Sequence, residues 1–288
     1  MKQKLFLVVF SIFFFSEAFA QAPFWKPVNA KTASKKPLCE RKTTPSKSLV
    51  YELDLENFKA ELKKCHQTSN KSQKSTPITF DFPNADGDFI TVSVSEKNVL
   101  HPELAEKFPH IKSYIGKDSK GNNIRFSITD FGLHAQIFTP NGTEYIDPYT
   151  QDGSHYLVYH RKSIQNKIPF TCLTKEANPI EDLEITPFLK KTAASDGVFR
   201  TYRLAMATTT EYSNFHINRA GVQNGNLLQK QSAVLSALSA TMTRVNGIFE
   251  KEFSVTMVLI PKNTDIIFID SDNFTNSNGE DLLEEVQP

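Results

Sequence analysis

The stretch LQKQSAVLSALSATMTRVNGIFEKEFSVTMVLI, residues 228–260, decides the expected fold of the second half of this chain. Apolar residues recur every three to four positions over 228–252, which predicts a long amphipathic helix. The aliphatic and β-branched residues of 253–260 predict a strand directly after it, and 199–208 has the same character before it. Strand, helix and strand in this order predict a right-handed parallel crossover.

The first half of the chain has a different pattern, with many short strands separated by turn residues. Asp54 is a plausible N-cap for a short helix that ends near Cys65. Ranges 78–82 and 90–94 alternate around the turn residues 84–88, which predicts a β-hairpin. Further short strands are predicted at 49–51, 113–116, 124–128, 132–138, 143–146 and 156–159. We therefore expect an α+β domain with a small antiparallel sheet over 49–160.

The domain organisation follows from these two halves. Apolar periodicity fades over 161–197, which we interpret as an exposed connector where a processing protease could cut. The segment 198–288 is then an incomplete α/β domain built on the strand–helix–strand unit. An isolated 198–288 segment should expose apolar faces and a strand edge, and should be prone to aggregation.

The N-terminal residues have the features of an export signal. Lys2 and Lys4 precede an apolar run over 5–15, and small residues follow at 18–20. This pattern predicts a signal peptide over 1–20 and a secreted protein, because the run is shorter than the roughly 20 residues that cross a bilayer. Residues 21–48 are basic and contain Pro, Ser and Thr, so we expect a flexible basic leader there.

Composition limits the class of partner. The chain is 39% hydrophobic and 23% charged, which is ordinary for a globular protein, and 288 residues usually make two domains. Removing residues 1–20 leaves equal numbers of basic and acidic residues, which argues against a nucleic-acid binder. No later segment is long and apolar enough for a membrane span. We expect no nucleic-acid partner and no membrane span.

Several stretches resemble reprolysin-like (adamalysin-type) zinc metallopeptidases of the secreted bacterial type. The stretches that resemble the start of the catalytic domain are 202–209, 244–250 and 255–260, and those that look like its propeptide are 102–105, 108–109, 124–126, 140–143 and 145–149. The resemblance implies a metzincin-like fold with a mixed sheet and two large helices. It also implies a Zn²⁺ ion held by the three His of an HExxHxxGxxH motif, whose Glu is the general base.

That zinc motif does not occur in these 288 residues. No pair of histidines has the i, i+4 spacing with an adjacent Glu, so we interpret all seven as surface or packing residues. They are His66, His101, His110, His134, His155, His160 and His216. The resemblance therefore implies a chain that stops before the zinc motif, is inactive alone, and has its Zn²⁺ bound by residues beyond it.

Cysteine and aspartate give two further hypotheses. Cys39, Cys65 and Cys172 allow three single-disulfide choices, one of which pairs Cys39 with Cys65. In the relatives a propeptide cysteine can ligate the active-site zinc, which makes Cys172 a candidate ligand of a zinc outside this chain, although no glycine follows it. A disulfide to a downstream cysteine and an idle thiol are the alternatives. Three loop aspartates could bind a cation or lie in solvated turns: Asp265, Asp270 and Asp272.

Together these observations lead to two functional hypotheses. The first is a secreted zinc metalloendopeptidase precursor that acts on proteins or peptides, with a propeptide domain that contacts the catalytic domain. The alternative is a secreted non-enzymatic binding or adhesion protein that retains a degenerate protease scaffold. An HExxH motif in the coding sequence beyond Pro288 would favour the first hypothesis.

Overall fold

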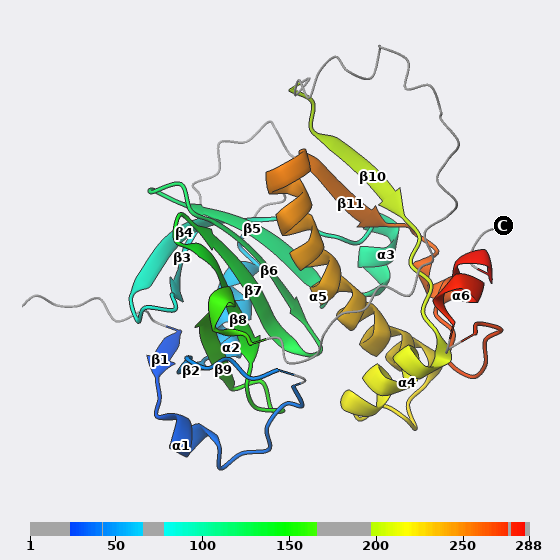
Figure 1. The fold of residues 1–288 in the computed structure, drawn as a ribbon, viewed down its shortest axis with the longest axis horizontal. Helices are drawn as coiled ribbons and strands as arrows, with labels where there is room; N and C mark the ends of the chain where they lie inside the picture. Colours follow the sequence, from blue (N-terminus) through cyan, green and yellow to red (C-terminus); the bar gives the residue numbers. More distant parts are fainter. Residues whose placement is uncertain (1–23, 42, 66–77, 166–196, 276–277, 286–288) are drawn as a thin grey trace, which may run out of the picture.

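The computed structural model describes residues 24–41, 43–65, 78–165, 197–275 and 278–285 (Figure 1). Its largest element is a nine-stranded antiparallel sheet in the order β1-β2-β9-β8-β7-β6-β5-β4-β3. The strands are β1 (Trp25–Pro27), β2 (Leu49–Leu53), β3 (Ile78–Pro83), β4 (Phe89–Glu96), β5 (Lys112–Asp118), β6 (Asn123–Thr129), β7 (Gly132–Thr139), β8 (Gly142–Pro148) and β9 (His155–His160). Four short helices belong to the same part: α1 (Ala30–Ala33), α2 (Leu55–Leu62), α3 (Pro102–Lys107) and η1 (Arg161–Ser163). We call the described residues 24–165 the sheet unit.

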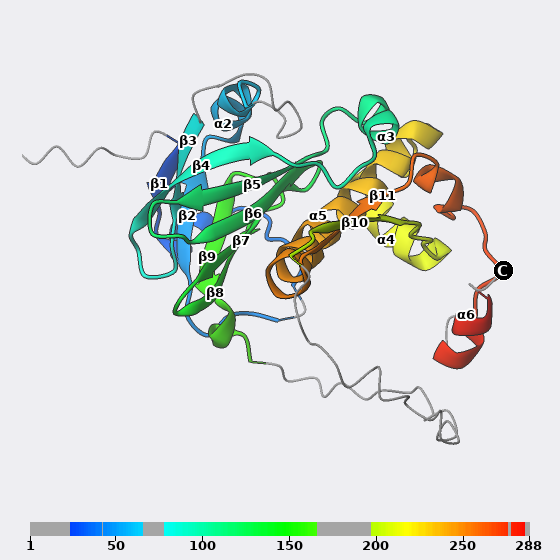
Figure 2. The ribbon, with the colours of Figure 1, turned by 90° about the horizontal axis from the view of Figure 1, so that it is seen from above.

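The sheet curves until its two edges nearly meet (Figures 1 and 2). The rings of Trp25 on β1 and Phe82 on β3 have centroids 6.2 Å apart, although these strands lie at opposite ends of the strand order. The inner face is apolar and aromatic, and α2 adds the buried Phe58 and Leu62 to it. Asp54 caps α2 by accepting a hydrogen bond from the backbone N–H of Asn57, as the sequence predicts.

The remaining elements form a second unit, which we call the C-terminal unit (described residues 197–285). They are β10 (Arg200–Leu204), α4 (Thr210–Arg219), α5 (Leu227–Phe253), β11 (Val255–Leu259), η3 (Asn263–Ile266) and α6 (Gly279–Glu285). β10 and β11 pair in parallel, and α5 lies between them in the chain. Asn226 and Gln229 form a capping box at the start of α5, and Ser254 ends the helix in the left-handed conformation (φ 55°).

The expected fold class is wrong. The first unit is a large, nearly closed antiparallel sheet and not an α+β domain with a small sheet, and the second is not a metzincin-like α/β domain, because α5 packs against β6 and β7 of the large sheet. The leader expected to be flexible over 21–48 is partly folded. β1 pairs with β2, and Trp25 is only 2% exposed because it packs into the aromatic core.

Several predictions about local structure are confirmed, and others fall outside the described residues. The long helix and the β-hairpin occur where the sequence predicts them, as α5 and as β3 with β4. The expected signal peptide (1–20) and most of the expected connector (161–197) lie outside the described part of the chain. Among the described helices, none combines the length and hydropathy needed to cross a bilayer.

Candidate functional site

The most elaborate polar arrangement of the described residues lies where α5 crosses the outer face of the sheet (Figure 1). On α5, small residues recur every three to four positions along the face toward the sheet, and all are buried: Ser232, Ser236, Ser239, Thr243 and Gly247. A Cβ added at Gly247 would lie 3.0 Å from Oε1 of Gln136 and 3.1 Å from the ring of Phe138, so glycine permits this close approach to β7. The opposite face of the helix is apolar and belongs to the C-terminal core.

The facing side of the sheet is polar as well. Along β6, Ile124, Phe126 and Ile128 point into the aromatic core, while the residues between them point outward. These outward residues are Arg125, Ser127 and Thr129, and each is at most 5% exposed. A polar strand face usually meets water, but this one is covered by a helix. The two units therefore meet through a buried polar seam.

The strongest link across the seam joins Arg125 of β6 to Glu250 of α5. The guanidinium donates two hydrogen bonds to the carboxylate, at 3.1 Å from Nε and 2.7 Å from Nη2, and a third at 3.0 Å to the carbonyl of Lys97. Lys97 Nζ lies 3.0 Å from the same carboxylate. The side chains of Arg125 and Glu250 are 3% and 10% exposed. Burial acts to raise the pKa of Glu250, but Arg125, a hydrogen bond with Thr256 and Lys97 outweigh it and lower that pKa, which favours the ionised carboxylate.

A second link joins Asp147 of β8 to Arg244 of α5. Arg244 Nη2 contacts Asp147 Oδ1, and the Tyr159 hydroxyl donates a hydrogen bond of 2.6 Å to the other carboxylate oxygen. Burial acts to raise the pKa of Asp147, but Arg244 and the hydrogen bond from Tyr159 lower it to about 2. Asp147 is therefore a permanent anion at this end of the seam.

A third link is a cluster of Ser, His and Asp. Asp130, in the β6–β7 turn, accepts hydrogen bonds from Ser232 (2.7 Å) and Ser236 (3.1 Å) of α5, and Nε2 of His110 lies 2.8 Å from the Ser232 hydroxyl. The same nitrogen is 3.2 Å from Asp130. A nucleophilic triad needs Ser and Asp on different ring nitrogens. This cluster therefore positions α5 and is not a hydrolase centre.

The sheet unit also contributes backbone to the C-terminal unit. Between β4 and β5 the chain leaves the sheet, and it lies alongside β11: the His101 N–H donates to the Leu259 carbonyl at 3.0 Å, and the Leu259 N–H donates to the Val99 carbonyl at 2.8 Å. Residue Leu100 forms a parallel bridge with Leu259. The edge of β11 that does not face β10 is thus covered by a segment of the sheet unit.

The residues that follow this segment complete a hydrophobic core. Helix α3 (Pro102–Lys107) lies between Leu100 and Ile111 in the chain. The buried apolar side chains of this segment are at most 2% exposed. They share one core with the apolar face of α5 and with β11. From the sheet unit, Val99, Leu100, Leu104, Phe108 and Ile111 pack with Val234, Leu235, Leu238, Met242 and Leu259. We call residues 97–111 the core insert. Among the described residues, no other part of the sheet unit belongs to the second core.

The other side of the C-terminal unit is open. Four of the five residues of β10 are exposed, and β11 is its only strand partner among the described residues. Large apolar side chains near it are exposed too, including Tyr202 at 53% and Phe253 at 65%. An edge strand with exposed apolar neighbours is a surface for further polypeptide.

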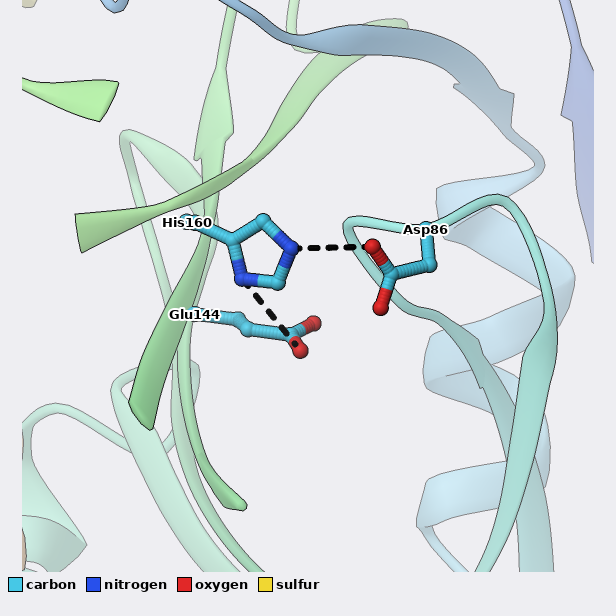
Figure 3. A group of neighbouring side chains, drawn as sticks. All are labelled: Asp86, Glu144 and His160. Atoms are coloured by element: carbon cyan, nitrogen blue, oxygen red, sulfur yellow. Dashed lines mark hydrogen bonds and ion pairs between the residues drawn. The ribbon is translucent and has the colours of Figure 1, made fainter. Parts of the chain in front are cut away.

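Three side chains could hold a metal ion elsewhere in the sheet unit (Figure 3). Asp86, Glu144 and His160 each offer one ligand atom, and these atoms lie within 4.8 Å of one another. Existing interactions already use them: His160 lies 3.0 Å from Asp86, and Glu144 accepts a 2.8 Å hydrogen bond from the Ala85 N–H. The cluster fastens the β3–β4 turn over β8 and β9 and helps to close the sheet.

The residues singled out in the sequence are not brought together. Cys172 lies outside the described residues, and Cys39 and Cys65 are both free, so the pairing considered for them does not form. Asp272 accepts hydrogen bonds from the N–H groups of Thr210 and Phe274 as part of a turn, and Asp265 and Asp270 join it in no metal-binding group among the described residues. The seam residues went unnoticed in the sequence. The available signal was the row of small residues from Ser232 to Gly247, which recur at intervals of four, three, four and four opposite the apolar face of α5.

Comparison with protein-family models, with curated proteins and with solved structures gave no match to this chain.

Proposed function

We propose that the sheet unit is a propeptide-type domain that holds the C-terminal unit in a folded, covered state. The core insert carries this proposal, because it supplies both a strand partner for β11 and five buried side chains to the second core. Strand addition gives affinity through main-chain hydrogen bonds, and buried side chains give specificity. A C-terminal unit without the insert would expose the edge of β11 and an apolar cavity.

The polar seam is suited to a reversible contact between the sheet unit and the C-terminal unit. Its small polar residues and ionised pairs resemble interfaces between separable proteins more than a continuous domain core. Each of the two units also has its own hydrophobic cluster. A propeptide must hold its partner during folding and leave it afterwards, and a polar seam with one apolar insert meets both needs.

We further propose that the whole is a secreted precursor of a zinc metalloendopeptidase that acts on proteins or peptides. The support is the resemblance of 202–209, 244–250 and 255–260 to reprolysin-like enzymes, together with the export signal over 1–20. In this proposal Zn²⁺ is bound by polypeptide beyond residue 288, and Cys172 is a candidate ligand that keeps the precursor latent. The exposed β10 is a surface on which such polypeptide could dock.

The test is to express the natural gene product in an exporting host and to measure its zinc content and its hydrolysis of a protein substrate before and after proteolytic removal of the sheet unit. We expect about one bound zinc per chain, and activity that rises at least tenfold on removal. A protein that holds no zinc and cleaves nothing in either form would contradict the peptidase proposal and favour a non-enzymatic binding protein.

A further inference from the structure

A polar cavity of about 420 Å³ opens at one end of the seam, between β7, β8 and β9 of the sheet unit and helices α4 and α5. Both units line it. The charged residues of its wall are Arg41, Arg161, Arg219, Arg244, Glu40 and Asp147. Four guanidinium groups thus face two carboxylates, and Asp147 already pairs with both Arg244 and Arg41, whose Nη2 lies 3.6 Å from its Oδ2.

Aromatic rings orient three of these guanidiniums, and that of Arg41 lies 5.4 Å from the ring centre of Tyr159. The guanidinium of Arg219 lies 4.6 Å from the ring centre of Phe131, and that of Arg244 lies 5.1 Å from the ring centre of Tyr145. Stacking of this kind fixes the plane of the guanidinium group. The cavity therefore has an excess of oriented, permanently charged donors.

Two buried polar atoms of the wall have no hydrogen-bond partner among the described residues. They are Nδ1 of His134 and Nε of Arg244. Buried polar atoms are nearly always satisfied by protein, water or a ligand. Burial and the neighbouring arginines lower the pKa of His134 to about 3, so its ring is neutral at physiological pH and has one N–H to donate.

We propose that this cavity binds a small oxyanion, a phosphate, a sulfate or a carboxylate, between the sheet unit and the C-terminal unit. Arg161 and Arg41 approach it from the sheet unit, while Arg219 and Arg244 approach it from α4 and α5. Planar guanidinium groups with several N–H donors match the geometry of oxyanions, and ligand-binding sites are common at domain boundaries. A bound oxyanion would link the two units. This inference is independent of peptidase activity.

The test is calorimetric titration of the purified chain with phosphate, sulfate and citrate at constant ionic strength, with sodium chloride as the control salt. We expect saturable binding of one oxyanion per chain. Tighter binding of phosphate and sulfate would identify a tetrahedral ligand, and tighter binding of citrate a carboxylate. A response that chloride reproduces would overturn the proposal, because it would reflect ionic strength alone.

Two variants test whether the oxyanion binds in this cavity. Arg161→Gln and Arg219→Gln are each expected to weaken binding about tenfold or more, since each removes a charge-assisted hydrogen-bond donor. Arg203→Gln on the exposed β10 is the matched control and should leave the affinity unchanged. Independently of any variant, NMR should show the His134 ring signals shifting with oxyanion concentration. Equal affinity in all three variants, or unchanged His134 signals at saturation, would overturn the site.

Discussion

Replacing Glu250 with Ala is expected to lower the free energy of unfolding by about 3–5 kcal/mol, because it leaves the Arg125 guanidinium buried without its counter-ion. Arg125 is 3% exposed at the seam, and apart from its bonds to Glu250 it donates a hydrogen bond to the Lys97 carbonyl. For a chain of this size the loss corresponds to a melting temperature lower by roughly 10 °C. Thermal and denaturant unfolding of the Glu250→Ala variant measure it.

The matched control is Glu252→Ala on the same helix. Glu252 is 55% exposed and pairs with its neighbour Lys251 at 3.4 Å, so its loss should change stability by at most about 0.5 kcal/mol. The double variant Arg125→Met, Glu250→Leu should recover most of the stability, since apolar groups can replace a buried ion pair at little cost. Equal effects of Glu250→Ala and Glu252→Ala would mean that the Arg125–Glu250 pair does not hold α5 on the sheet.

Replacing Leu104 with Ala is expected to destabilise the C-terminal unit by about 2–5 kcal/mol, although Leu104 lies in the sheet unit. The side chain is fully buried between the apolar face of α5 and β11, so its removal opens a cavity in the second core. Hydrogen exchange should therefore quicken in α5 and β11, while β6, β7 and β8 keep their protection.

Leu62→Ala is the matched control for this variant. Like Leu104, Leu62 lies in a short helix, and its side chain is only 2% exposed. It packs in the inner core of the sheet and not in the second core. Its loss should quicken exchange in the sheet and leave α5 protected. If both leucine variants gave the same exchange pattern, the two cores would unfold as one and the core insert would have no separate role.

The sequence predicted the elements that depend on local periodicity. The apolar repeat of α5 and the alternation of β3 and β4 are local signals, and both elements formed as expected. The nine-stranded sheet was not predicted, because its pairings join distant residues such as Leu49 with Val158. β1 is three residues long and contains Pro27, so no local pattern indicates that it extends the sheet.

The seam was missed for a different reason. The outward residues of β6 and the serines of α5 each look like a solvated polar face when read alone. Arg125 and Glu250 lie far apart in the sequence, and only the folded chain brings the two faces together. The zinc-peptidase resemblance could not indicate this arrangement, because its motifs describe the C-terminal unit and the sheet unit separately.

The most direct measurement concerns the dependence of the C-terminal unit on the core insert. A recognition site for a specific protease, placed between residues 170 and 190, allows the folded chain to be cut into two pieces. We predict that the pieces elute together, and that after separation in denaturant the C-terminal piece regains slow hydrogen exchange in α5 and β11 only when the N-terminal piece is present. A C-terminal piece that is monodisperse and unfolds cooperatively by itself would contradict this account.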